Sequence, residues 1–152
     1  MAEKNYLSTV DRDLLEKEYF YLQNIVKDYD DKALTIKTWS VSIAGAIAGS
    51  SAFTDSKEVL LFASLVSFMF WLVEGSWKSF QRSHYDRIDA IESFMRGKRG
   101  AAETNNFQIS KSWVESYMKK YRKSLPELLM TTHVFLPHGA FFFLLLIAYF
   151  LF

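Results

Sequence analysis

The sequence predicts an all-α helical membrane protein with a transmembrane hairpin, a long helix projecting into the cytoplasm and a third span at the C-terminus. Residues 38–53 and 59–73 are apolar and are separated by a short polar turn. The second stretch runs into an amphipathic pattern ending at Met95, with only Gly75 between, and a lone glycine costs a helix only about 1 kcal/mol. Residues 134–152 carry no formal charge, so we expect a third span there.

The chain of 152 residues is short enough to form one domain. Its apolar and charged residues lie in separate blocks, which divide it into a cytoplasmic helix (1–37), the transmembrane hairpin (38–73), cytoplasmic helices (74–132) and the third span (133–152). There is no cysteine, which excludes disulfides and thiolate metal sites.

The first block predicts an amphipathic helix after a short arm at residues 1–10, with Thr9 as a cap. Its apolar residues recur at steps of four and three and form a seam. A second seam of this kind includes Ile88 and runs from residue 77 to 95. The two seams either pack on each other within the chain or join copies of it. The first seam comprises Leu15, Tyr19, Leu22, Val26 and Tyr29.

The first arm of the hairpin is built from small residues. Gly45 and Gly49 form a small-xxx-small pair, which lets membrane helices approach closely. We therefore expect this arm to face protein and to contribute to helix packing or to a homo-oligomer. Residues 54–58 form the turn before the second arm.

The second arm carries a polar stripe, because five of its residues recur at steps of three and four on one helix face. If several copies surround an axis, this face lines a pore and Glu74 forms a charged ring at its mouth. The alternative is that Glu74 simply reaches headgroup water. The stripe consists of Ser64, Ser67, Trp71, Glu74 and Lys78.

Basic residues gather in the block after Met95. Two readings stay open for them: contact with anionic lipid beside the membrane, or a site for an anionic ligand such as a nucleotide. Ser112 and Glu115 predict a capping box for a short helix, and Pro126 opens the next one. The basic residues are Arg96, Lys98, Arg99, Lys111, Lys119, Lys120, Arg122 and Lys123.

The distribution of Lys and Arg predicts the orientation. Residues 1–37 hold six, residues 54–58 one and residues 74–132 eleven. The positive-inside rule then places the N-terminus and the middle block in the cytoplasm and the C-terminus in the periplasm.

The histidines and carboxylates do not form a catalytic or metal-binding pattern. His84 lies on an apolar seam, and His133 and His138 are five residues apart, the wrong step for joint ligation on one helix face. We expect no enzyme activity, no metal and no cofactor, and no sequence-specific binding of nucleic acid.

The layout resembles the SLATT-type membrane effectors of bacterial conflict systems. The likeness covers about residues 14–96 and rests on three segments: Glu18-Tyr-Phe-Tyr-Leu-Gln23, Ala33-Leu-Thr-Ile-Lys-Thr-Trp-Ser40 and Trp71-Leu-Val-Glu-Gly-Ser-Trp-Lys-Ser-Phe-Gln81. It implies an oligomeric inner-membrane pore that damages or depolarises the membrane during phage infection. Members of the family stand beside nucleotidyltransferase-type sensors, as in systems of the Hailong kind, and a nucleotide or protein signal controls them.

A looser likeness is to the membrane accessory protein of type VI-B CRISPR systems. Its nuclease motif needs an Arg followed by a His five to seven residues on, whereas here Arg82 is followed by His84, so nuclease activity is not carried over. The expected function is therefore a pore-forming defence effector. The alternative is a non-conducting membrane anchor whose cytoplasmic helices recruit another protein.

Overall fold

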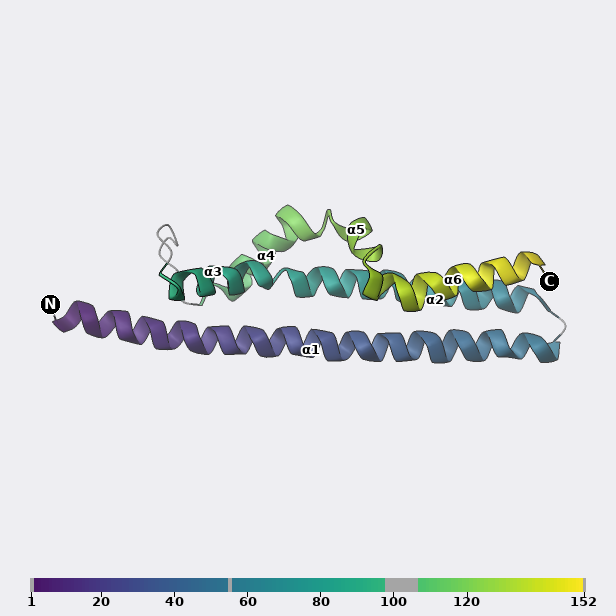
Figure 1. The fold of residues 1–152 in the computed structure, drawn as a ribbon, viewed down its shortest axis with the longest axis horizontal. Coiled ribbons are helices and arrows are strands. Elements are labelled where there is room, and N and C mark those ends of the chain that lie inside the picture. The colour runs from purple at the N-terminus through teal and green to yellow at the C-terminus, as the bar shows by residue number, and fades with distance from the viewer. Residues whose placement is uncertain (1, 55, 98–106, 152) are drawn as a thin grey trace. The chain divides into compact units, whose positions relative to one another are not determined.

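The computed structural model describes residues 2–54, 56–97 and 107–151, with side chains from residue 12 onward. All regular structure in these ranges is helical, which confirms the predicted fold class at that level. The helices in chain order (Figure 1) are α1 (Ala2–Thr54), α2 (Glu58–Arg82), α3 (Tyr85–Met95), α4 (Ile109–Ser116), the π-helix η1 (Tyr117–Tyr121), α5 (Leu125–Leu129) and α6 (Thr132–Leu151).

Two predicted helix boundaries are wrong. Helix α1 runs unbroken from Ala2, where the sequence predicts an arm and a start at Thr9. The uninterrupted helix predicted to end at Met95 is divided by a turn at residues 83–84. There the backbone N–H of His84 donates to the carbonyl of Gln81 at 3.0 Å. This acceptor is three residues back instead of four, so the helical turn is tighter at this point. Gly75, by contrast, lies within α2.

The short helices also differ from the prediction in one detail. Helix α4 begins at Ile109 with Gln108 as its N-cap, so the predicted capping box of Ser112 and Glu115 does not form. The Ser112 N–H instead donates to the Gln108 carbonyl at 2.9 Å, inside the helix. Pro126 lies in the first turn of α5, as predicted.

The chain forms two compact units. Unit 1 comprises Met1–Tyr29 and Phe80–Lys123, and unit 2 comprises Asp30–Ser79 and Ser124–Phe152. Each unit therefore takes one part of α1 and one part of α2.

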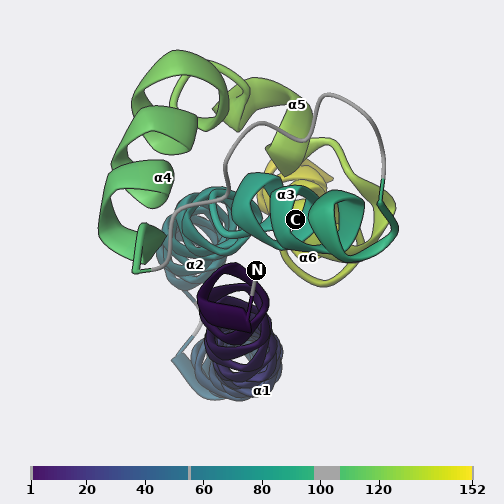
Figure 2. The same ribbon diagram turned by 90° about the vertical axis from the view of Figure 1, so that its left-hand side faces the viewer.

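Unit 1 has a core where the two predicted seams meet within one chain. Leu22 and Ile88 are buried in it, with no exposed surface for Leu22. These two residues are therefore packed inside the chain and are not available for contacts between copies. Figure 2, which looks onto this unit, shows α1 and α4 on different sides of α2 and α3. The core consists of Leu15, Leu22, Val26, Ile88 and Ile91.

A buried ion pair crosses the same unit. Arg87 Nε donates to Glu18 Oε1 at 2.8 Å and its Nη2 donates to Oε2 at 3.0 Å, which is a bidentate arrangement. The backbone N–H of Phe107 also donates to Glu18 Oε2 at 3.1 Å. Glu18 and Arg87 are both buried, so this carboxylate ties α3 and the start of the α4 segment to α1.

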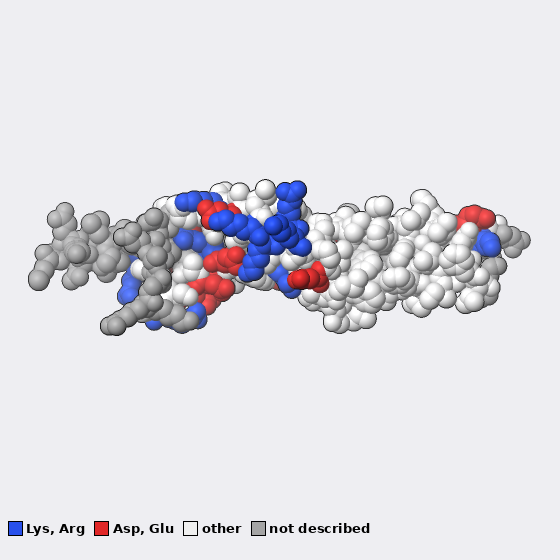
Figure 3. Space-filling view, turned by 90° about the horizontal axis from the view of Figure 1, so that it is seen from above, with Lys and Arg blue, Asp and Glu red and all other residues white. Residues whose placement is uncertain are grey.

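Two helical stretches among the described residues are long and apolar enough to cross a membrane: Glu58–Met95, through its apolar first half, and Thr132–Leu151. This criterion is one of length and composition, and residues 38–53, helical within α1, are not among the stretches that meet it. On the face drawn in Figure 3, a wide surface without coloured Lys, Arg, Asp or Glu extends along unit 2.

Helix α2 holds α5 and α6 close to its surface in unit 2. Trp71 Nε1 donates to the carbonyl of Leu129 at 3.0 Å, and the Trp71 ring lies against Phe135 and Phe143 of α6. Gly75 permits this approach, because a Cβ at that position would lie 2.5 Å from Leu129 Cδ2. Gly75, which the sequence predicts to be tolerated within the helix, is thus a close-packing site.

Candidate functional site

Unit 2 contains a buried cluster of ionisable and hydroxyl side chains contributed by three helices. His138 of α6 lies between Glu74 of α2 and Ser40 of α1, with Nε2 2.5 Å from Glu74 Oε2 and Nδ1 2.7 Å from Ser40 Oγ. The Nζ of Lys37 lies 3.0 Å from Glu74 Oε1. Ser40 and His138 have no exposed surface and Glu74 has 1%.

The hydrogen bonds of the cluster assign donors and acceptors. An ionised carboxylate only accepts, so His138 Nε2 donates to Glu74. Nδ1 then accepts the Ser40 hydroxyl hydrogen if the ring is neutral, or donates to Ser40 Oγ if it is charged, so both bonds persist in either state. Lys37 contacts Glu74 Oε1 as an ion pair without the angle of a hydrogen bond, and Oε1 has no hydrogen-bond partner among the described residues.

The position of each group follows from helix geometry. Lys37 and Ser40 are three residues apart, so they lie on one face of α1, and Glu74 and Ser67 are seven apart on one face of α2. Ser67 Oγ donates to the backbone carbonyl of His138 at 2.9 Å, which joins α2 to α6 again, deeper in the apolar region. The cluster thus lies at the end of the apolar segments opposite the turn between α1 and α2.

The predicted polar stripe does share one face of α2, but that face is covered within the same chain. Ser64 and Ser67 have no exposed surface, and Trp71 has 5%. Lys78, one turn beyond Glu74, forms an ion pair with Asp30 of α1 at 3.1 Å. Lining a pore would therefore require this face to be uncovered.

Sequence reasoning missed Lys37, Ser40 and His138 as members of a site. The one available signal is His138 itself, a histidine inside an otherwise apolar span, and the five-residue spacing of His133 and His138 argues only against joint ligation on one helix face. That separation is irrelevant, because the partners of His138 come from other helices.

The predicted basic set is partly neutralised by acids of unit 1, as Figure 3 shows by the red atoms among the blue ones. Lys120 pairs with Asp86 at 3.1 Å, Lys119 with Glu115 at 3.4 Å and Arg96 with Glu92 at 3.2 Å, and all three pairs are exposed. The Tyr121 and Asp86 side chains, as hydrogen-bond partners, raise the pKa of Lys120. Lys111, Arg122 and Lys123 are exposed, and Lys98 and Arg99 lie outside the described residues.

The predicted packing glycines are open to their surroundings. A Cβ placed on Gly45 or Gly49 would meet nothing within 4 Å. These glycines are thus not used for close helix packing among the described parts of the chain.

We expect His84 to make the stability of unit 1 depend on pH. It is buried beside the rings of Tyr29 and Trp113, and its Nδ1 has no hydrogen-bond partner among the described residues. Burial lowers the pKa of His84, since it disfavours the charged ring. The unfolded chain then binds this proton first, so the free energy of unfolding should fall as the pH drops below about 6.5.

Thermal unfolding between pH 7 and pH 5 measures this effect. A His84→Phe variant should lose stability less steeply than the wild type over that interval, because the titrating group is gone. A His133→Gln variant serves as the control. If the stability of the His84→Phe variant falls with pH as steeply as that of the wild type, His84 does not cause the dependence.

Among the described residues, no group of three or more His, Cys, Asp or Glu side chains is placed to hold a metal ion. Comparison with protein-family models, with curated proteins and with solved structures finds no match for this chain.

Proposed function

We propose that this chain is a helical inner-membrane protein that assembles into an ion-conducting pore, with the cluster of Lys37, Ser40, Glu74 and His138 as its gate. The observation that carries the proposal is the burial of Glu74, which has 1% exposed surface and lies within α2, where the apolar stretch of that helix ends. Ionisable groups within membrane helices are costly, and they commonly mark ion pathways.

The cluster acts as a latch in this proposal. The stripe of α2 is closed by its own chain, since α6 contacts Glu74 through His138 and α1 contacts it through Lys37. Ser40 of α1 bonds to His138 and so joins the two covering helices. Moving α6 away would uncover Ser67 and Glu74, because both are bonded to His138. Several copies around one axis would then form a polar path whose mouth carries a ring of carboxylates, which concentrates cations.

The resemblance to SLATT-type effectors supports the biological setting. A pore of this kind would depolarise the bacterial inner membrane during phage infection, under a nucleotide or protein signal, with a nucleotidyltransferase-type sensor as a partner. The N-terminus and unit 1 would lie in the cytoplasm and the C-terminus in the periplasm, in accordance with the excess of Lys and Arg in those blocks.

Exchange of Glu74 for glutamine tests the proposal. Glutamine keeps the shape and can still accept from His138, so assembly should persist while the ring loses its charge. In planar bilayers with a tenfold salt gradient, the reversal potential of Glu74→Gln should move toward zero compared with the cation-selective wild type.

The matched control is Glu127→Gln, which removes an exposed carboxylate of unit 2 from α5 and should leave the potential unchanged. Identical reversal potentials for wild type and Glu74→Gln would exclude Glu74 from the conducting path. A complete absence of ion flux from both proteins would contradict the pore itself.

The alternative is a non-conducting anchor that recruits another protein. An open pocket in unit 1 favours it, since the pocket offers a partner an apolar surface between α1 and α3. Under this alternative, reconstituted protein of confirmed orientation shows no flux, whereas the isolated membranes retain a cytoplasmic partner.

A further inference from the structure

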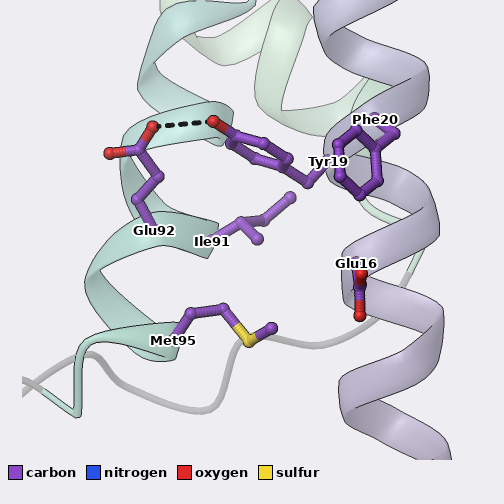
Figure 4. A pocket seen from close by; sticks show the side chains of 6 residues that line it. All are labelled: Glu16, Tyr19, Phe20, Ile91, Glu92 and Met95. Atoms are coloured by element: carbon purple, nitrogen blue, oxygen red, sulfur yellow. Dashed lines mark hydrogen bonds between the residues drawn. The ribbon is translucent and has the colours of Figure 1, made fainter.

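Unit 1 has an open apolar pocket between α1 and α3 with two carboxylates at its rim. Its volume is about 400 Å³. In Figure 4 Tyr19 and Phe20 approach from α1, Ile91 and Met95 from α3, and the Tyr19 hydroxyl donates to Glu92 at 3.2 Å. The lining residues are Glu16, Tyr19, Phe20, Ile91, Glu92 and Met95.

The same unit presents an apolar ridge on α4 and η1. Val114 and Met118 are four residues apart on one helix face, and each has 51% of its surface exposed. Exposed cations flank them on both ends, Lys111 one turn before and Arg122 one turn after. The ridge therefore has the shape of two apolar side chains between two positive charges.

The ridge cannot turn into the pocket of its own chain. Trp113 Nε1 donates to the carbonyl of Phe80 at 3.0 Å, and Lys120 pairs with Asp86 at 3.1 Å, so α4 and η1 are held against α2 and α3. Figure 2 shows α4 and α1 on different sides of these helices.

We propose that the ridge of one copy docks into the pocket of the next copy. Val114 and Met118 would enter the apolar pocket, and Lys111 and Arg122 would meet the rim carboxylates of Glu16 and Glu92. Because two different surfaces meet, the contact is head-to-tail, and it generates a closed ring or an open filament. The proposal does not rest on ion conduction, since an anchor would assemble in the same way.

The absence of cysteine from the chain permits a direct test by disulfide formation. Two differently tagged variants, Glu16→Cys and Met118→Cys, are co-expressed and oxidised in the membrane. A disulfide needs Cα atoms within about 7 Å. The control pair replaces Glu16→Cys with Lys27→Cys, an exposed position on α1. The yield of the mixed dimer should be at least tenfold higher with Glu16→Cys than with this control.

Three results would each overturn the proposal: equal yields with Lys27→Cys, a predominance of dimers joined through two Glu16→Cys chains, or no mixed dimer.

An exchange of charge provides the second test. Glu16→Lys should reduce the assembled fraction severalfold in mass photometry, and a second change to glutamate at the cation that faces position 16, either Lys111→Glu or Arg122→Glu, should restore it. Unchanged assembly in Glu16→Lys, or a loss that the second change does not restore, would also overturn it.

Discussion

Replacing Glu18 with alanine should destabilise unit 1 by about 3–5 kcal/mol, because it removes the carboxylate that pairs with the buried guanidinium of Arg87. Glu18 accepts both N–H groups that Arg87 directs at it, at 2.8 and 3.0 Å, and Arg87 is itself buried. The Phe107 N–H loses its acceptor in the same change. Denaturant unfolding followed by circular dichroism in detergent measures the loss.

The control for this variant is Asp13→Ala, which removes an exposed carboxylate from the same helix and should change stability by less than about 0.5 kcal/mol. The double variant Glu18→Leu with Arg87→Met removes both charges, so it should recover most of the loss. A loss below about 1 kcal/mol in Glu18→Ala would mean that the carboxylate is not packed against Arg87.

The same ion pair shows what the sequence predicts and what it leaves open. The seams that contain Leu22 and Ile88 follow from helical periodicity, and the structure joins them in one core. Glu18 and Arg87 lie beside those seams. The periodicity shows on which face of its helix each residue lies, but it does not show which residue of another helix it contacts. Their pairing depends on the register between α1 and α3, which the side-chain pattern of either helix alone does not specify.

The candidate site in unit 2 could likewise be predicted only in part from the sequence. The stripe of Ser64, Ser67, Trp71 and Glu74 on one face follows from steps of three and four, and this much could be predicted. Which helix covers that face could not. His138 is 64 residues from Glu74, and Ser40 is 98 from His138, so only the packing of three helices brings them together. The turn at His84 was also missed, because no glycine or proline marks it.

Replacing His138 with leucine should destabilise unit 2 by an amount similar to the loss in Glu18→Ala, about 3–5 kcal/mol. Leucine fills the space of the ring but removes the donor at 2.5 Å from Glu74 and the partner of Ser40. Lys37, whose side chain is 27% exposed, then remains the one cation beside the carboxylate. His133→Leu, an exposed position on the same helix, is the matched control and should lose far less stability than His138→Leu.

A second measurement on these variants separates a latch from a purely structural bond. If the bond between His138 and Glu74 holds α6 over the stripe, His138→Leu should raise the resting ion leak of liposomes, whereas His133→Leu should not. The double variant His138→Leu with Glu74→Leu also removes the buried carboxylate that has lost its histidine donor, so it should regain thermal stability in detergent. If the double variant regains stability and both His138 variants leak ions no faster than the wild type, the cluster is a structural element and takes no part in gating. If His138→Leu is as stable as the wild type, the cluster itself is contradicted.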